Sequence, residues 1–413
     1  MDLQVELENN TKNKLTTHNM VETHYGYDHM VYIRLFEGCN LHCEHCFIPS
    51  NPKKIQPSFY ENKGLTNELV NKAKGLKEGD RIYLQWHGGE PTLLGPQYLR
   101  NAIENVIADK RFKYMNGIQT NLMNFHENTE EWLNLYRDYF DNHLGVSWDY
   151  KIRHFRASQL NEEENYQKFE KIFWNNIKLA QNNGIELYMV ITVTKLFFEH
   201  FKNPFDFFNF ISEKGIQKLN FERITKTGFA RETWEKLGLS NKEYAFYMSR
   251  FFKAYKLFKE NNPDIILNIS PFDGLEISVI DYFKEKLISK VEKANIWDIM
   301  SFKNQGYGCW SGECDTRFHT IDSNGYKQGC TALNSEQDNK NKSVSNLGSK
   351  IMWVKKSQIQ DFREQRAERQ LNCDGCEFIR ICSSGCLSVE KFDESQECSG
   401  AKTLFKTIKD YHF

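Results

Sequence analysis

The sequence has no long apolar run, no apolar signal segment and no excess of one charge. Its longest apolar runs, such as LYMVITV at 187–193, are far shorter than the about 20 residues that a membrane-spanning helix needs. The N-terminal stretch MDLQVELENNTKNK is polar and lacks the apolar core of a secretory signal. Because 54 basic side chains stand against 55 acidic ones, no surface for nucleic acid is indicated. We therefore expect a cytoplasmic protein that binds neither a membrane nor a nucleic acid.

Cysteine, in contrast, is abundant, with eleven residues in the chain. Thiols stay reduced in the cytoplasm, so this number suggests metal ligands rather than disulfides. Three of them stand in EGCNLHCEHCF at 37–47, directly after the apolar run VYIRLF. We call these three residues, Cys39, Cys43 and Cys46, the triad.

The triad suits a site that keeps one coordination position open. An odd number of thiols does not pair off as disulfides, and a closed zinc site takes four ligands. Three thiolates on an iron–sulfur cubane leave one iron open to another molecule. On the loop after a first strand, the triad would lie at the mouth of a parallel sheet, where such folds place their active sites. The alternative is a zinc site completed by His42 or His45.

Strand and helix patterns alternate along the first two thirds of the chain. β-Branched or aromatic runs predict strands at 31–36, 81–86, 114–120, 143–148, 186–193 and 217–223. Helical patterns stand at about 65–75, 96–109, 128–140, 162–183 and 203–214, and a sixth begins after 240. Repeated strand–helix units favour parallel strands with right-handed crossovers. Six units are too few for a closed eight-stranded barrel, so we expect an α/β fold with an incomplete (β/α)6 TIM-like barrel or an open sheet.

The remaining segments differ in composition from the repeated units. Residues 1–28 are polar and rich in asparagine, which indicates an irregular N-terminal arm. We assign the barrel to 29–264, a helical bridge to 265–304, and a cysteine-rich, glycine-punctuated domain to 305–413. This last domain carries the other eight cysteines, which make two sets of four. Two structural zinc sites are the alternative there.

Two cysteine patterns resemble a known family. CNLHCEHC at 39–46 resembles the CxxxCxxC signature of the radical SAM enzymes, which use S-adenosylmethionine (SAM). CDGCEFIRICSSGC at 373–386 has the CX2CX5CX3C spacing of the iron–sulfur SPASM domain found in many of them. Upstream, Cys314, ten residues, Gly325, four residues and Cys330 match the preceding half of that domain. The resemblance covers about residues 30–230 and 305–400.

The resemblance implies three [4Fe–4S] clusters and SAM as cofactors. In this family the triad holds a cluster whose open iron binds the amino and carboxylate groups of SAM. One electron from that cluster cleaves SAM to methionine and a 5′-deoxyadenosyl radical, which abstracts a substrate hydrogen. A first auxiliary cluster would use Cys309, Cys314, Cys330 and Cys386, here called the first tail set. A second would use Cys373, Cys376, Cys382 and Cys398, here called the second tail set.

The resemblance also implies contacts with SAM. WHGGEPTLLG at 86–95 resembles the family's GGEP motif. Its glycines let the backbone approach the ligand, and its glutamate can accept from the SAM ammonium group. Positions matching the contacts with the SAM ribose and carboxylate follow the fourth strand, and further contacts fall after the third and on the fifth strand. The expected SAM-binding residues are Gly88, Gly89, Glu90, Asn121, Ser147, Arg156 and Ile191, with Glu222 and Arg223 lining the mouth.

Two positions depart from the family pattern. The residue before the third triad cysteine is usually a large aromatic, and here it is His45. In sulfatase-maturating members an aspartate base follows the cysteine that corresponds to Cys330, whereas this chain has Thr331, which argues against that activity. No catalytic base is assigned. The nearby candidates His87, Asp149 and Asp322 are expected to be mostly structural or surface groups.

These patterns predict a radical SAM oxidoreductase that modifies a peptide or protein side chain. A crosslink or another net oxidation of a ribosomally made peptide is the expected outcome, with a reducing electron donor such as flavodoxin or ferredoxin. The alternatives are an anaerobic sulfatase-maturating enzyme, a small-molecule radical dehydrogenase and a zinc-stabilised binding protein without catalysis. The N-terminal arm is expected to be too short for a leader-binding domain, so another surface or a partner protein would recognise the peptide.

Overall fold

The computed structural model describes residues 26–34, 38–48, 76–156, 159–289, 306–315, 317–322, 325–332 and 362–413. Most of the predicted N-terminal arm, the helix expected at 65–75 and the second part of the helical bridge lie outside these residues. The described helices include none that is both long and apolar enough to cross a bilayer.

One sheet of nine strands organises the molecule, in the order β11-β10-β1-β3-β4-β5-β7-β8-β9. Six of its strands lie where the sequence predicts them, each parallel to its neighbours among the six. They are β1 (His29–Arg34), β3 (Arg81–His87), β4 (Lys113–Thr120), β5 (His143–Ser147), β7 (Glu186–Val193) and β8 (Lys218–Arg223). The α/β class with an incomplete barrel is therefore confirmed.

Three further strands extend this sheet beyond the predicted six. β9 (Asn268–Ser270) pairs in parallel with β8 at one end. At the other end β10 (Phe318–Asp322) pairs in parallel with β1, and β11 (Gly325–Gln328) folds back on β10. The hairpin β10–β11 comes from the cysteine-rich part of the chain. The tail therefore shares a sheet with the barrel.

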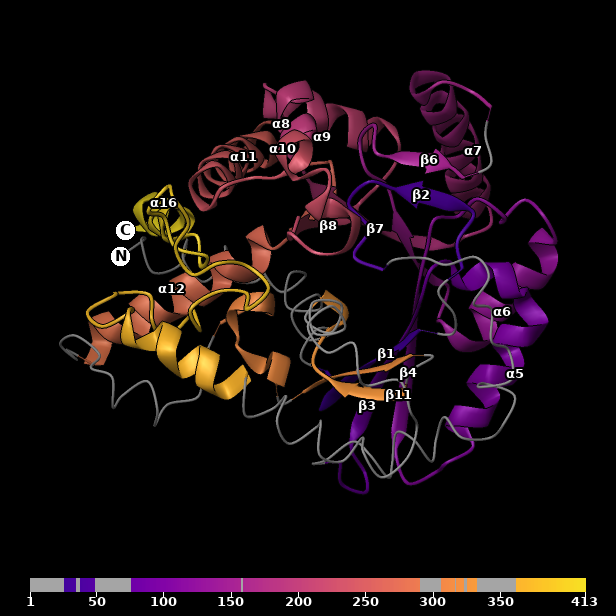
Figure 1. The fold of residues 1–413 in the computed structure, drawn as a ribbon, viewed down its shortest axis with the longest axis horizontal. Coiled ribbons are helices and arrows are strands. Elements are labelled where there is room, and N and C mark those ends of the chain that lie inside the picture. Colours follow the sequence, from indigo (N-terminus) through magenta and orange to yellow (C-terminus); the bar gives the residue numbers. More distant parts are fainter. Residues whose placement is uncertain are drawn as a thin grey trace, which may run out of the picture.

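Helices cover the outer face of the strands (Figure 1). They are α5 (Pro96–Ile107), α6 (Thr129–Tyr139), α7 (Glu162–Asn182), α8 (Lys195–His200), α9 (Pro204–Glu213), α10 (Trp234–Leu237) and α11 (Asn241–Asn261). Capping boxes begin the two longest, with Asn161 and Glu164 at α7 and Ser240 and Glu243 at α11. Each therefore begins at a sequence signal that satisfies two backbone N–H groups.

Residues alternate along each strand between a core-facing and an inward-facing side. On β3, Ile82, Leu84 and Trp86 are fully buried against the helices, whereas Tyr83 and Gln85 are only partly buried. The inward positions carry polar side chains on β4, β5, β7 and β8 as well, among them Gln119, Ser147, Tyr188, Thr192, Asn220 and Glu222. The barrel therefore has a polar interior, which we call the lumen.

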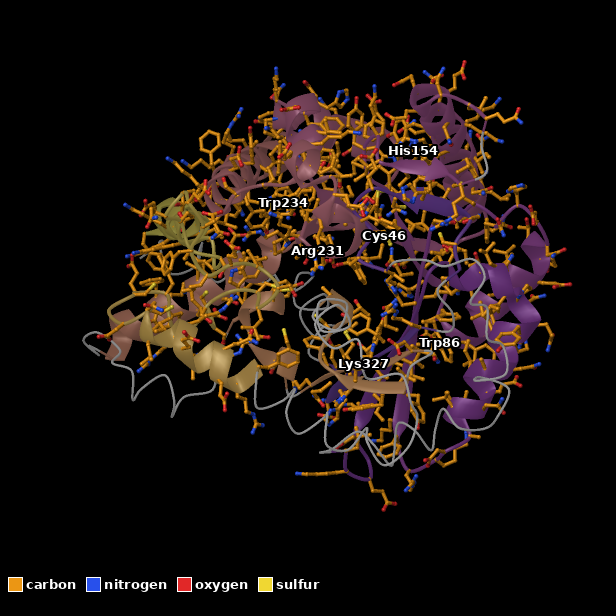
Figure 2. The ribbon with its side chains drawn as sticks, viewed as in Figure 1. Cys46, Trp86, His154, Arg231, Trp234 and Lys327 are labelled. Atoms are coloured by element: carbon orange, nitrogen blue, oxygen red, sulfur yellow. The ribbon has the colours of Figure 1, made fainter. Side chains whose placement is uncertain are left out.

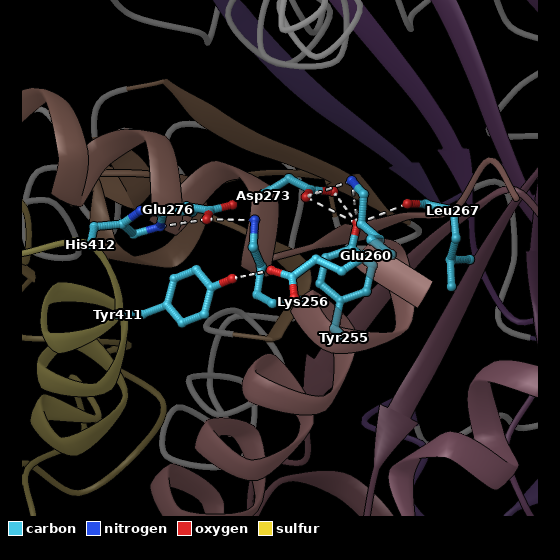
Figure 3. A network of polar contacts seen from close by, with 9 residues as sticks. Tyr255, Lys256, Glu260, Leu267, Asp273, Glu276, Tyr411 and His412 are labelled. Atoms are coloured by element: carbon cyan, nitrogen blue, oxygen red, sulfur yellow. Dashed lines mark hydrogen bonds and ion pairs between the residues drawn. The ribbon is translucent and has the colours of Figure 1, made fainter. Parts of the chain in front are cut away.

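The end of the chain packs on the last helices of the barrel. α16 (Lys402–His412) lies beside α11 and α12 (Phe272–Ser289), at the left of Figure 1. Tyr411 donates to Glu260 at 2.6 Å, and Glu276 accepts from both His412, at 2.6 Å, and Lys256, at 2.8 Å (Figure 3). These contacts attach the tail to the barrel at a second place, distant in sequence from β10.

Candidate active site at the mouth of the barrel

The triad lies on the segment that leaves β1. Cys39 stands five residues after Arg34, the last residue of β1, and Cys43 ends β2 (Leu41–Cys43), which pairs antiparallel with β6 (Arg153–Phe155). The amide of Leu41 donates to the Cys39 sulfur at 3.3 Å, and the Cys46 thiol donates to the carbonyl of Ile48 at 3.2 Å. Cys46 lies toward the middle of the ring of strands and helices (Figure 2). The short β2–β6 ribbon, which the sequence did not predict, thus holds the triad segment in place.

The electrostatics of the triad are those of thiols that need a positive partner. Burial raises the pKa of Cys39 to about 12, and burial also raises the pKa values of Cys43 and Cys46. The thiols lie close enough for the negative charge of one to disfavour ionisation of another. Thiolates are the form that binds metal. The donor set therefore fits a group that supplies positive charge, as an iron–sulfur cluster does.

The alternative of a single zinc ion finds little support in the geometry. Among the residues described, no three His, Cys, Asp or Glu side chains lie close enough together to hold one metal ion. His45 is paired with Asp149 at 3.2 Å, and the ring of His42 packs edge-on against Phe229. The thiolate ligands of one zinc ion all lie about 2.3 Å from that ion and so lie close to one another. The ligands of a cluster each bind a different iron and therefore stand farther apart. The triad therefore suits a cluster better than zinc.

The GGEP turn ties the ends of three strands together beside the triad. Gly88 has a φ of 144°, which side chains with a Cβ rarely adopt, and the Glu90 amide donates to Gly38 at 2.8 Å. Glu90 is 1% exposed, and its Oε1 accepts from the amide and hydroxyl of Thr92 and from the hydroxyl of Thr120. Its Oε2 accepts from the amide of Asn121 at 2.6 Å. The four hydrogen bonds favour the charged form of Glu90, but burial outweighs them, so the pKa of Glu90 is raised.

Asn121 reaches the triad directly. Its side-chain amide donates to the side-chain oxygen of Asn40 at 2.8 Å and lies 3.7 Å from the sulfur of Cys39. Asn40 in turn donates to Asn124 at 3.2 Å. The sequence pointed to Asn121 and missed Asn40, whose position inside the cysteine signature was the available signal.

The other predicted SAM contacts fall in three different surroundings. Ser147 ends β5, faces the lumen and accepts from Gln119 at 2.7 Å. Arg156 lies beside the triad segment, where its Nε donates to the carbonyl of Leu41 at 3.0 Å. It also borders a cavity of about 410 Å³ that includes His42 and His154. Ile191 is 0% exposed and belongs to the core-facing side of β7, so only its backbone borders the lumen. Gly89 stands in the turn between Gly88 and Glu90, and is partly exposed.

The candidate bases near the mouth are largely engaged in buried contacts. Asp149 is 0% exposed and accepts from Arg153 at 2.8 Å and from the amide of Thr192 at 2.5 Å. Asp322 pairs with Lys327 at 2.9 Å and with Arg34 at 3.5 Å. These two carboxylates hold elements together. Burial lowers the pKa of His87 to about 4, which keeps its ring neutral near neutral pH.

The first tail set comes together against the barrel. The pKa of Cys309 is raised first of all by the neighbouring thiol of Cys386, and that of Cys314 by the thiol of Cys330, so the members of each pair lie close together. Charge on Cys386 disfavours ionisation of both Cys309 and Cys314, which places the two pairs side by side. Cys330 and Cys309 both act on the ionisation of Tyr32, whose side chain lies on the inward side of β1, so this set borders the lumen.

The second tail set also comes together. Burial raises the pKa of Cys382 to about 12, and the charges of Cys398, Cys373 and Cys376 raise it further. Gly400 lies against this set, because a Cβ there would stand 2.7 Å from the sulfur of Cys382. The cysteines of each tail set therefore lie near one another, and their role as ligands of two clusters stays a prediction.

Glu222 stands in the lumen between the triad and the first tail set. Its side chain is exposed although β8 is an interior strand, because it faces the open interior of the barrel. Surrounding protein nevertheless raises its pKa, first by burial and then through Cys386 and Asp149. The negative charge of Glu222 also raises the pKa values of Tyr32 and Tyr188. The sequence placed Glu222 at the mouth but missed both tyrosines, which alternation along β1 and β7 could have found.

Arg223, the next residue on β8, points away from the lumen toward the tail. Its guanidinium donates to Asn241 at 2.6 Å and to the carbonyl of Ser399 at 3.3 Å, and it stacks on Tyr244. The alternation of the strand therefore separates the two residues that the sequence placed together at the mouth.

Comparison with known proteins identifies the class. Residues 33–207 match the family model of the Radical SAM superfamily. No curated protein matches the chain. Residues 33–207 therefore form a radical SAM domain, the kind of domain that uses SAM and the [4Fe–4S] cluster that cleaves it.

Similar solved structures extend the fold match to the tail. A structure of anSMEcpe with bound AdoMet (SAM) has a TM-score of 0.55 and 17% identity, covering 93% of this chain and 96% of that one. A second, with bound AdoMet and the Cp18Cys peptide, has a TM-score of 0.56 and 17% identity, covering 92% and 96%. SuiB of Streptococcus suis bound to its precursor peptide SuiA has a TM-score of 0.50 and 14% identity, covering 91% and 76%. At these identities the likeness concerns the fold, which spans barrel and tail together.

Proposed function

We propose that this radical SAM enzyme oxidises a side chain of a peptide or protein with the help of two auxiliary [4Fe–4S] clusters in its tail. The observation that carries the proposal is the grouping of eleven cysteines into a triad beside the barrel mouth and two sets of four in the tail. The bound peptides of the similar structures, Cp18Cys in anSMEcpe and SuiA in SuiB, support a peptide substrate.

The triad and the GGEP turn would form the SAM site. Cys39, Cys43 and Cys46 would hold the cluster that supplies the electron for cleaving SAM into methionine and a 5′-deoxyadenosyl radical. Asn121, 3.7 Å from the Cys39 sulfur, would donate to a ligand thiolate and stabilise its negative charge. Oε2 of Glu90 accepts one hydrogen bond where Oε1 accepts three, so Oε2 is the oxygen available to the SAM ammonium group.

The lumen would hold the substrate side chain. It lies between the triad and the first tail set, and polar groups from several strands face it, including Glu222, Tyr188 and Gln119. Such a wall offers hydrogen bonds to a polar or cationic side chain and excludes bulk water from a reactive carbon. Glu222 is the lumen carboxylate best placed to accept from the substrate, since among the described residues its side chain accepts from one donor, Asn220, at 3.1 Å.

The two tail sets would serve oxidation of the substrate. Each supplies four thiolates, so no iron would stay open for substrate, and electron transfer is the role that remains. A reducing donor such as flavodoxin or ferredoxin would exchange electrons with the enzyme. Thr331, buried beside Cys330, cannot act as the carboxylate base expected of a sulfatase-maturating enzyme.

Reaction of the reconstituted enzyme with peptides encoded beside its gene tests the proposal. With SAM and a strong reductant, we expect a peptide product that has lost two hydrogen atoms, together with 5′-deoxyadenosine. Iron and sulfide assays should give about twelve irons per chain, four for each cluster. About four irons with stoichiometric zinc would contradict the auxiliary clusters. Turnover of a small alcohol, with every neighbouring peptide unchanged, would contradict the peptide substrate.

A further inference from the structure

Lys391 lies directly against the second tail set. Its ammonium nitrogen is 2.8 Å from the sulfur of Cys373, which makes it a hydrogen-bond donor to a predicted cluster ligand. The charge of Lys391 also acts on Cys382 and Cys398. One ammonium group thus influences three of the four thiols of the set.

The backbone holds Lys391 in this position. Its carbonyl accepts from the amide of Ser399 at 2.9 Å, and the next residue, Phe392, forms a β-bridge with Cys398. The ammonium also lies 5.3 Å from the centre of the Phe392 ring. The backbone at Lys391 is therefore paired with the segment around Cys398, and this pairing places the side chain beside the second tail set.

The first tail set has a different electrostatic environment. Cations near it are guanidinium groups that bind backbone carbonyls: Arg369 donates to Cys386 at 2.8 Å, and Arg366 donates to Ser383 at 2.7 Å. The ammonium of Lys391, in contrast, donates to a ligand sulfur itself rather than to a backbone carbonyl.

We propose that the ammonium of Lys391 raises the reduction potential of the iron–sulfur cluster held by the second tail set. This inference rests on the proposed function, because it requires that cluster to be present. Reduction adds one negative charge to a cluster, and a cation held against a ligand sulfur stabilises the reduced form. Hydrogen bonds to the sulfurs and local charge are the means by which proteins adjust these potentials. Lys391 is thus a tuning residue, which touches neither substrate nor SAM.

A redox titration followed by electron paramagnetic resonance tests the inference. The full-length chain with its triad replaced by alanine shows only the tail clusters, in wild-type form and with Lys391→Met or Lys391→Arg. At a fixed potential we expect Lys391→Met to lower the ratio of reduced to oxidised cluster about tenfold in one of the two signals. For one electron this corresponds to a downward shift of about 59 mV. Lys391→Arg keeps the charge and should keep most of the potential.

Lys256→Met is the matched control, because Lys256 is also partly buried and ion-paired, with Glu276 at 2.8 Å. It should leave both signals unchanged. A Lys391→Met protein with full iron content and an unchanged potential would overturn the inference while leaving the proposed function intact. Loss of iron in both Lys391→Met and Lys391→Gln would overturn it in favour of a role in cluster assembly. Iron for only one tail cluster in the wild-type chain would overturn the proposed function as well.

Discussion

The triad and the two tail sets place their cysteines in opposite ways. The triad takes its three residues from one short segment, 39–46, whereas the tail sets span 309–386 and 373–398 and overlap in sequence. The triad segment stands on a barrel with a large continuous core. Tail residues such as Trp310, Phe378 and Leu404 join this core from outside, and the one separate apolar group described in the tail is small, with Cys314, Phe362 and Leu387.

This difference predicts that the triad serves the chemistry alone, whereas the two tail sets also contribute to folding. The triad can lose its cluster without loss of the barrel, because the strands and helices around it are held by their own buried side chains. The tail has little core of its own, so binding of metal there would contribute to its folding free energy. The following predictions test this contrast, from the largest effect to the smallest.

Removal of the triad should abolish SAM cleavage and leave the two tail clusters in place. In the variant with Cys39, Cys43 and Cys46 all changed to alanine, we expect no 5′-deoxyadenosine above background and about eight irons per chain. Chromatographic assay of 5′-deoxyadenosine under reduction, with an iron assay on the same sample, measures both. Continued 5′-deoxyadenosine formation would show that SAM is bound elsewhere.

Loss of a ligand from the second tail set should separate product formation from SAM cleavage. Cys376→Ala should lose product but keep part of its uncoupled 5′-deoxyadenosine formation, because the triad is untouched. The amounts of product and 5′-deoxyadenosine in the same reaction are compared, with circular dichroism as the control for folding. Full product formation without the cluster would make the tail a passive scaffold.

Replacement of Glu222 should weaken binding of the substrate side chain in the lumen, between the triad and the first tail set. A hydrogen bond to a charged group contributes about 1.5–3 kcal/mol, so Glu222→Gln should lower kcat/KM for the peptide by about 10- to 100-fold. SAM cleavage without substrate and iron content should stay at wild-type values. Asn220→Ala, which removes the neighbour that donates to Glu222 at 3.1 Å, should have a smaller effect. Equal kcat/KM for wild type and Glu222→Gln would remove Glu222 from the substrate site.

The weakest effect concerns the attachment of α16 to the barrel (Figure 3). Burial would raise the pKa of Glu276, but hydrogen bonds and charge from His412 and Lys256 outweigh it, so the pKa is lowered. The lowered pKa means that this pairing stabilises the fold above the unfolded-state pKa, near 4.5, and is lost as the pH falls through the folded-state value. Glu276→Gln should therefore cost about 1–2 kcal/mol at pH 7.

Urea unfolding of wild type and Glu276→Gln measures this cost. The difference in the free energy of unfolding should shrink as the titration is repeated at pH values falling from 4.5 through the lowered pKa of the folded state, where the wild-type carboxylate becomes protonated. Glu260→Gln is the control, because it makes the same substitution at the carboxylate that accepts from Tyr411 and leaves Glu276 unchanged. A difference that does not depend on pH would contradict the ionic origin of the effect.

Much of the barrel was predictable because its signals are local. Alternating residues marked the strands β3 and β7, and the apolar faces and caps marked α7 and α11. The ribbon of β2 and β6 was missed because three-residue strands carry no period. The pairing of β10 with β1 was missed because it joins residues nearly 290 positions apart, and no local pattern reports such a contact.

The sequence by itself determined the number and spacing of the cysteines, and with them the kind of chemistry that the chain can support. Only the tertiary structure decided which side chains act on one another: that Asn121 reaches Cys39, that Glu222 and Arg223 face opposite sides of β8, and that Lys391 touches Cys373. The physical reason is that the two kinds of feature depend on different separations, one along the chain and one in space. Spacing and alternation are properties of neighbouring residues, whereas hydrogen bonds and charge interactions depend on distance in space, which the packing of the whole chain sets.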